Sequence, residues 1–335
     1  MYRQGVGILG AVDRKLIDIE DSNQDFLTRN LHKIHERLQG LFSKFLEEQI
    51  RAIEDTKVKI KKRKGVIAFM KTFPHFAIAI ENMLPPESDC EQLETRRMVN
   101  DGYQRINKAM FESLRVIAKE SPTVMASQGQ GDPEDKEALN YHILLIENMN
   151  HYMEEVDARS DSVLEYWKNK AQDEYTEHMN LYVDAVIRRP LGKLLVSLLS
   201  KSAPKKKTPH MSNHPYHQQE FLESTETILA QPTTTPATIS QRSSHARPVF
   251  KKLAHAHDSK ELRKGIEALK KRVDKHFGDA DDPGISRDLV WKVLRECEAQ
   301  YARLAERLEV VNQDVYGGEV EIGWGVREVE AGFRR

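Results

Sequence analysis

The sequence contains few cysteines and few glycines, and both shortages exclude classes of protein. Cys90 and Cys297 are far apart, and neither has a Cys or His neighbour at the spacing of a zinc site. We therefore expect neither a disulfide framework nor a metal knuckle, and a reducing, cytosolic setting fits best. Glycine accounts for 17 of 335 residues, below the usual share of about 7%, which disfavours folds with many tight turns.

The chain also lacks long apolar runs and an excess of charge of one sign. No stretch approaches the roughly 18 apolar residues that cross a bilayer, and the first ten residues do not follow the pattern of a signal peptide. Lys and Arg number 51 against 52 for Asp and Glu, so the whole chain has no field that attracts nucleic acid. Nucleic acid is therefore not an expected partner.

Motifs for catalysis or cofactor binding are missing or out of context. GVGILG (5–10) matches the dinucleotide-binding pattern, but only four residues precede it and no strand pattern follows. Two groups of residues resemble metal ligands but lack the required spacing, and we interpret them as polar residues on helix surfaces: His32, His35 and Glu36, and His255, His257 and Asp258. We expect no enzyme activity, no cofactor, no metal and no small-molecule substrate.

Apolar residues at alternating spacings of four and three are abundant, which is typical of amphipathic helices. Four stripes follow this rule: Leu27, Leu31, Ile34, Leu38, Leu41, Phe45; Leu145, Met149, Tyr152, Val156; Leu262, Ile266, Leu269, Val273; and Val290, Leu294, Cys297, Tyr301, Leu304, Leu308, Val311, Val315. Asp258 and Glu261 precede the third stripe at capping-box spacing. Strand-like alternation is limited to Val320–Val326. The sequence predicts an all-α fold, an elongated stack of helical bundles.

Polar segments suggest how the bundles are divided. We predict a first helical bundle region at 11–126, a loop at 127–138, and a second region at 139–335, interrupted by a disordered insertion at 200–219 and a polar linker at 231–249. Removing 196–219 would join Ile187, Leu191 and Leu194 to Leu222 without breaking the apolar alternation. This favours an inserted segment, such as a retained intron, over the alternative of a genuine surface loop.

A basic run at 57–64 has six cations in eight residues: Lys57, Lys59, Lys61, Lys62, Arg63 and Lys64. One interpretation is a solvated helix end beside acidic neighbours, because cations complement the dipole at a helix C-terminus. The other interpretation is a contact with an acidic partner subunit or with anionic lipid. The sequence leaves these alternatives open.

Five segments in order resemble one protein family, the C-terminal region of fungal exocyst complex component 1. They are KIKKRKGVIAFMKTFPHFAIAIENML (59–84), NYHILLIENMNHYMEEVD (140–157), AVIRRPLGKLL (185–195), HFGDADDP (276–283) and VYGGEVEIGWG (315–325). The similarity covers most of residues 11–335. None of these segments is a chemical signature, but together they are specific to the family.

The resemblance implies a non-catalytic subunit of the complex that tethers secretory vesicles to the plasma membrane before fusion. It implies a rod of helical bundles, other exocyst subunits as partners, and a cytoplasmic location at the inner face of the plasma membrane at sites of secretion. Full-length fungal members carry an N-terminal pleckstrin-homology-like domain and a coiled coil, and this chain begins after both. Lipid and GTPase binding by that domain are therefore not expected here. The alternative function is a peripheral membrane-binding module acting through the basic run.

Overall fold

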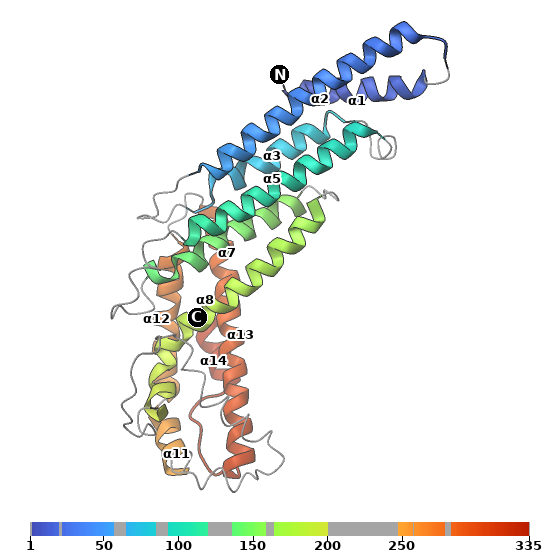
Figure 1. Ribbon diagram of the computed structural model, residues 1–335. Helices are drawn as coiled ribbons and strands as arrows, with labels where there is room; N and C mark the ends of the chain where they lie inside the picture. The colour runs from blue at the N-terminus through green and yellow to red at the C-terminus, as the bar shows by residue number, and fades with distance from the viewer. Residues whose placement is uncertain are drawn as a thin grey trace, which may run out of the picture. The chain divides into compact units, whose positions relative to one another are not determined.

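The computed structural model describes residues 2–19, 22–56, 65–84, 93–119, 136–158, 164–199, 247–256, 258–278 and 283–334. Within these ranges the chain forms ten helices and no strand (Figure 1). The predicted all-α fold is therefore confirmed. Among the described helices, none is both long and apolar enough to cross a bilayer.

The chain divides into two compact units, which we describe separately. Unit 1 comprises residues 1–131 and 140–178, and unit 2 comprises residues 132–139 and 179–335. Residues 140–178, which the sequence analysis assigned to the second region, therefore lie in unit 1. The division into separate bundle regions at 127–138 stays a prediction.

Unit 1 is a bundle of antiparallel helices around an apolar core. It contains α1 (Tyr2–Asp18), α2 (Asp25–Glu54), α3 (Ala68–Glu81), α5 (Glu94–Lys119), most of α7 (Lys136–Asp157) and the first part of α8 (Glu165–Leu199). Helix α5 is central, because it contacts α1, α2 and α3 and also packs against α7 and α8 through Phe111. The Phe111 ring meets Tyr152 edge-on at 5.5 Å and Trp167 at 5.1 Å.

Asn148 on α7 fixes the segment that leads into α3. Its amide oxygen accepts a hydrogen bond of 2.8 Å from the backbone N–H of Ile67, and its amide nitrogen lies 3.4 Å from the carbonyl oxygen of Gly65. Gly65 has a φ of 67°, a backbone conformation that residues other than glycine rarely adopt. The glycine that ends the basic run in the sequence therefore makes the turn into α3.

Unit 2 contains the remainder of α8 with α11 (Arg247–Ala256), α12 (Ser259–Phe277), α13 (Pro283–Tyr316) and α14 (Val326–Arg334). The core is formed by α12, α13 and α14, which contact one another pairwise. Phe250 of α11 stacks on Tyr316 at a centroid distance of 4.5 Å. Lys270 on α12 donates hydrogen bonds to the carbonyls of Gly332 and Phe333, which are among the unpaired acceptors at the end of α14.

Two of the four predicted stripes form core faces as expected. The stripe of α7 and the stripe of α12 are fully buried, and Asp258 caps α12 by accepting from the N–H groups of Lys260 and Glu261. On α13 the stripe is buried from Cys297 onward except for half-buried Leu304, but upstream the buried residues are Leu289 and Val293 rather than Val290 and Leu294. In the N-terminal part of α13 the buried face is therefore displaced by one residue from the predicted stripe.

The strand suggested at Val320–Val326 is wrong. Residues 319–325 form an irregular connection, and Val326 begins α14. Asn312 on α13 holds this connection, since its amide exchanges hydrogen bonds with the carbonyl and N–H of Val320. Val320 and Trp324 are buried, so the alternation of apolar residues reflects a loop that packs two side chains inward.

Several predicted segments lie partly or wholly outside the described residues. The insertion at 200–219 lies entirely outside them. The last three residues of the predicted loop at 127–138 belong to α7, the last three of the predicted linker at 231–249 belong to α11, and the rest of both segments lies outside. The status of 196–219 as an inserted segment stays a prediction.

Candidate interaction surface

The basic run proposed as a contact site lies outside the described residues. Helix α2 ends at Glu54, and the description resumes at Gly65. The alternatives for Lys57, Lys59, Lys61, Lys62, Arg63 and Lys64 therefore remain as the sequence left them.

Helix α2 does not bury the stripe that the sequence predicts. Its buried residues are His35, Phe42, Leu46 and Ile53. An α-helix turns by about 100° per residue, so this buried face lies roughly a quarter turn away from Ile34 and Leu41. The predicted stripe of α2 therefore differs from the face that packs in the core, which meets α1 and α5.

The predicted stripe is instead an apolar surface, which we call the α2 stripe: Leu27, Leu31, Ile34, Leu38, Leu41 and Phe45. Ile34 is 45% exposed and Leu41 is 48% exposed, and Leu27 is also exposed. Leu31, Leu38 and Phe45 are half-buried, and Phe45 contacts the rings of Phe42 and Phe76 at the edge of the core. The stripe therefore joins the core along one edge and faces solvent along the other.

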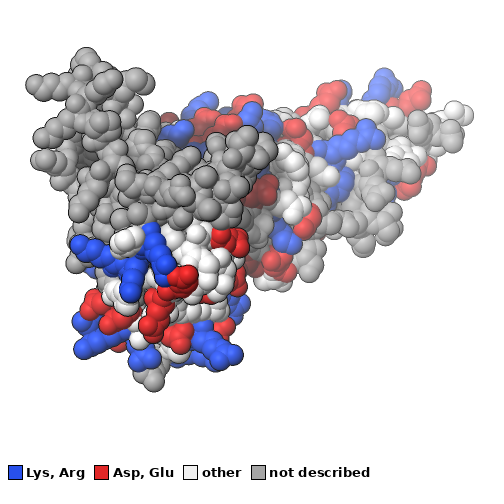
Figure 2. Space-filling model, turned by 90° about the horizontal axis from the view of Figure 1, so that it is seen from below, with Lys and Arg blue, Asp and Glu red and all other residues white. Residues whose placement is uncertain are grey.

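Three cations lie at the solvent edge of the α2 stripe, and one acidic residue, Glu48, lies on the same side beyond Phe45 at the C-terminal end of the stripe. Lys33, Arg37 and Lys44 are exposed, and within the described part of the chain none of them forms an ion pair. On a helical wheel Arg37 and Lys44 lie within about 60–80° of Ile34, on the side opposite the buried face. Elsewhere charges of both signs are mixed, as Figure 2 shows for one face of the molecule.

Beneath this surface, a buried polar cluster joins α1, α2 and α5. One carboxylate oxygen of Asp13 accepts hydrogen bonds from the backbone N–H (2.7 Å) and the hydroxyl (2.5 Å) of Thr95, in the first turn of α5. The other oxygen lies 2.7 Å from Nε2 of His35, although the ring is not aligned for a good hydrogen bond. The interpretation of His35 as a surface residue is therefore wrong, whereas His32 is exposed as expected.

The cluster does not have the geometry of a metal centre. Asp13, His35 and Glu94 place single ligand atoms within 4.8 Å of one another. Two ligands on one zinc ion would be about 3.3 Å apart, whereas Oδ1 of Asp13 and Nε2 of His35 are in direct contact at 2.7 Å. The second oxygen of Asp13 is already engaged by Thr95, so the arrangement fits a capping interaction at the start of α5.

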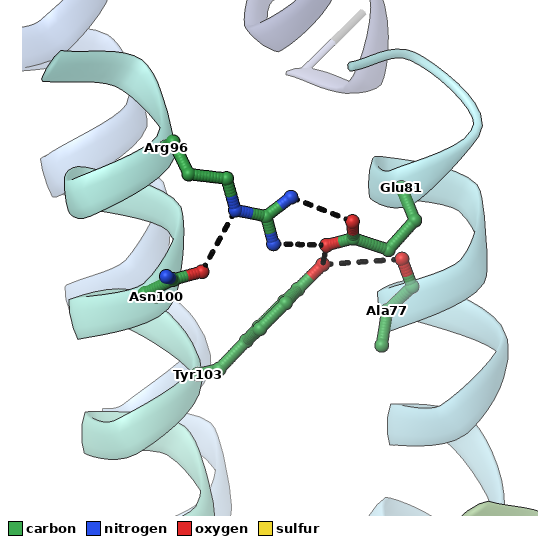
Figure 3. A network of polar contacts seen from close by, with 5 residues as sticks. All are labelled: Ala77, Glu81, Arg96, Asn100 and Tyr103. Carbon is green, nitrogen blue, oxygen red and sulfur yellow. Dashed lines mark hydrogen bonds and ion pairs between the residues drawn. The ribbon is translucent and has the colours of Figure 1, made fainter. Parts of the chain in front are cut away.

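A second polar network connects α3 to α5 (Figure 3). Arg96 pairs with both oxygens of Glu81 at 2.7 and 2.9 Å, and its Nε donates to Asn100. The hydroxyl of Tyr103 lies 2.8 Å from Glu81 and 3.1 Å from the carbonyl oxygen of Ala77. These contacts satisfy a buried guanidinium and fix the packing of the two helices, which is a structural role.

Further along unit 1, two imidazoles form a close pair. The Nδ1 atoms of His142 on α7 and His178 on α8 are 3.1 Å apart, and the ring of Tyr141 meets His178 edge-on. Burial lowers the pKa of His142 to about 4, with a smaller contribution from His178. Burial also lowers the pKa of His178, against the opposing effect of Glu177 and Glu174. The pair is therefore held neutral, with one Nδ1 as donor and the other as acceptor.

The remaining motifs from the sequence carry no site chemistry in the structure. GVGILG lies inside α1, so it does not follow a strand. His255 is exposed, Asp258 caps α12, and His257 lies outside the described residues. Cys297 is a free, buried thiol whose pKa is raised by burial, which disfavours the reactive thiolate.

Comparison with known proteins places the chain in a family. The family profile described as "Exocyst complex component Sec3, C-terminal" matches residues 3–214 and 218–318. The match is interrupted at 215–217, inside the predicted insertion. No solved structure matches the chain.

Three relatives are each called exocyst complex component 1. The mouse protein is 24% identical over 81% of this chain, the Drosophila melanogaster protein 21% over 92%, and the Dictyostelium discoideum protein 20% over 89%. The aligned region makes up 25–29% of each relative, so the chain spans about a quarter of their length. With the family profile matched over most of its residues, the chain belongs to the exocyst complex component Sec3 C-terminal family.

Proposed function

We propose that this chain acts as a non-catalytic scaffold in the exocyst, where it binds other subunits and contributes to the docking of secretory vesicles at the plasma membrane. The observation that carries the proposal is the family match over residues 3–318, apart from 215–217. The all-helical architecture of the described residues is consistent with it. In such a subunit the functional residues lie on exposed helix faces rather than in a cleft.

The structure supports a scaffold role through its buried polar groups. The clusters at Asp13, Arg96 and His142 are each engaged by groups on neighbouring helices, and each contributes to holding helices together. Chemistry of this kind stabilises a surface and leaves no activated nucleophile at these positions. We propose a cytoplasmic location at the inner face of the plasma membrane, at sites of secretion.

The proposal is tested by binding. The purified chain, immobilised through a terminal tag, is incubated with each of the other exocyst subunits, purified singly and in pairs. We expect stable retention of at least one subunit at physiological salt. Retention of none, singly or in pairs, would contradict the proposal, whereas an unrelated helical protein of similar charge serves as the negative control.

A further inference from the structure

We propose that the α2 stripe is a docking surface for an amphipathic helix of another subunit, with apolar residues at 3.5-residue spacing and acidic residues along the edge that meets Lys33, Arg37 and Lys44. This inference rests on the proposed function and adds the surface and the chemistry of the partner. Figure 1 shows α2 at the edge of its unit, with its neighbours α1, α3 and α5 on one side.

The first argument is that the solvent-facing residues of the stripe, Leu27, Ile34 and Leu41, are apolar although they are not part of the core. An exposed helix face is normally polar, but here six apolar residues keep the alternation of four and three from Leu27 to Phe45, over about 27 Å of helix. The fully buried residues His35, Phe42 and Leu46 lie on a different face, and Phe45 of the stripe packs at the edge of the core. An apolar seam with this period is the pattern by which one helix packs along another.

The second argument concerns charge. The edge of the stripe nearest the core is closed, because His35 and Phe42 are buried there. A docking helix is therefore flanked by open surface on one side only, where Lys33, Arg37 and Lys44 are exposed without ion pairs among the described residues. Opposite charges across a helix pair favour association, so the partner is expected to carry Asp or Glu at this edge.

The same charges disfavour a second copy of the chain as the occupant. If two α2 helices paired antiparallel, Arg37 and Lys44 of one copy would face the same cations of the other. If they paired parallel, the cations would face the edge that His35 and Phe42 close. A partner with a different sequence avoids both problems.

The first experiment uses designed peptides as probes. One labelled peptide of about four heptads has Leu at positions a and d and Glu at e and g, and its counterpart has Lys at e and g. Fluorescence anisotropy measures their binding to the purified chain. We expect the Glu peptide to bind at least about tenfold more tightly than the Lys peptide at low salt, and the difference to shrink as salt is raised.

Two sets of variants tie this binding to α2. Ile34→Glu combined with Leu41→Glu should lower the affinity for the Glu peptide by at least about tenfold, because both residues lie in the middle of the stripe. Val116→Glu is the matched control, since Val116 is 52% exposed on α5 of the same unit. All three positions are already exposed, and unchanged circular dichroism and melting will verify folding.

Charge reversal provides the decisive test. Lys33→Glu, Arg37→Glu and Lys44→Glu together should reverse the preference, so that the Lys peptide binds more tightly than the Glu peptide. Equal binding of both peptides, or no effect of Ile34→Glu with Leu41→Glu, would overturn the proposal. Concentration-dependent dimerisation that Ile34→Glu with Leu41→Glu abolishes would identify a second copy as the occupant and would equally overturn it.

The second experiment uses the purified exocyst subunits. The Ile34→Glu, Leu41→Glu chain should lose at least one subunit that wild-type and Val116→Glu chains retain. If wild-type chain retains subunits and the double variant retains them equally, the docking inference fails while the proposed function stands. If wild-type chain retains no subunit, the proposed function fails, and the peptide experiment still decides whether the α2 stripe binds acidic helices.

Discussion

Asp13 supplies a helix cap that the sequence beside α5 does not provide. Leu93 immediately precedes α5 and has no side-chain acceptor, and Asp13 on α1 instead accepts from the N–H of Thr95. The carboxylate also lies where the α5 dipole is positive. A residue 82 positions away therefore satisfies a need that is usually met locally.

Replacing Asp13 should destabilise the protein. Asp13→Ala leaves the buried N–H of Thr95 without an acceptor and His35 without its partner, so we expect the free energy of unfolding to fall by about 2–4 kcal/mol. Urea denaturation followed by circular dichroism measures the change. Asp18→Ala, on the exposed part of the same helix, is the control and should change stability by less than about 0.5 kcal/mol. A small effect at Asp13 would mean that water replaces the carboxylate.

The pair of His142 and His178 should make stability dependent on pH. The pKa of His142 is lowered from 6.5 to about 4 in the folded protein, and that of His178 is also lowered. As pH falls below 6.5, the unfolded chain binds protons that the folded chain excludes, so the free energy of unfolding decreases between about pH 6.5 and pH 4. The contribution of His142 is on the order of 2–3 kcal/mol.

Denaturant titrations at several pH values test this behaviour. His142→Gln should reduce the change in unfolding free energy between about pH 6.5 and pH 4. His32→Gln, at an exposed position of α2, should leave this pH dependence unchanged. Identical slopes for wild type and His142→Gln would show that the imidazole is protonated as easily in the folded protein as in the unfolded chain.

At the scale of the elements, the contact between α3 and α5 combines an ion pair with close packing. Arg96 is buried, whereas the side chain of Glu81 is 27% exposed. Arg96→Leu should therefore lower the free energy of unfolding by about 2–3 kcal/mol, since Glu81 and the hydroxyl of Tyr103 stay partly shielded from water after the cation is removed.

A double-mutant cycle separates the pair from the packing. Arg96→Leu combined with Glu81→Leu should recover part of the loss, because both charges are removed together. Arg97→Leu, at the exposed neighbouring position, is the control. Strict additivity of the two changes in unfolding free energy would show that the ion pair itself contributes nothing.

The approach of α5 to α2 depends on a glycine. A Cβ at Gly102 would lie 2.9 Å from Cδ1 of Leu46, whereas a Cβ at Gly40 of α2 meets nothing within 4 Å. Gly102→Val should lower the free energy of unfolding by about 1–3 kcal/mol through overpacking. Gly40→Val removes an unfavourable helix residue and should be neutral or stabilising by a few tenths of a kcal/mol. Thermal melts of the two variants compare the sites, and equal effects would contradict close packing.

At the scale of the whole molecule, a variant of the basic run allows effects on folding and effects on assembly to be measured separately. If the run is solvated, reversing Lys61, Lys62 and Lys64 to Glu should lower the free energy of unfolding only a little, because exposed charges usually contribute less than about 1 kcal/mol each. Melting curves of the triple variant measure this cost. Unfolding of the variant would mean that the run packs against acidic residues of the fold.

The same variant distinguishes the two open interpretations of the run. Flotation with phosphoinositide vesicles at moderate salt tests the lipid alternative, and retention of exocyst subunits tests the protein alternative. Loss of either property in a folded variant would identify the partner of the run, and loss of neither would favour a solvated segment.

The fold class could be predicted from the sequence because an amphipathic helix can be recognised from the spacing of its apolar residues. The stripes of α7 and α12 are core faces for which spacing alone was sufficient, and Asp258 was recognisable as a cap from its position. Candidate sites were harder to predict. Asp13 interrupts an otherwise apolar face of α1, whereas Asn148 is one of four consecutive or neighbouring buried polar residues of α7, with Glu147, Asn150 and His151. The spacing along the chain does not indicate which groups these residues contact.

Sequence by itself determined that the chain is all-helical, that it resembles an exocyst subunit, and which residues lie together on a helix face. Only the tertiary structure decided which face of α2 is buried, because a helix with apolar residues on two faces can pack either one. The choice depends on long-range partners, namely the meeting of His35 with Asp13 and the insertion of Leu46 beside Gly102. Spacing along the chain carries no information about such partners, and the apolar face that was not chosen remains at the surface.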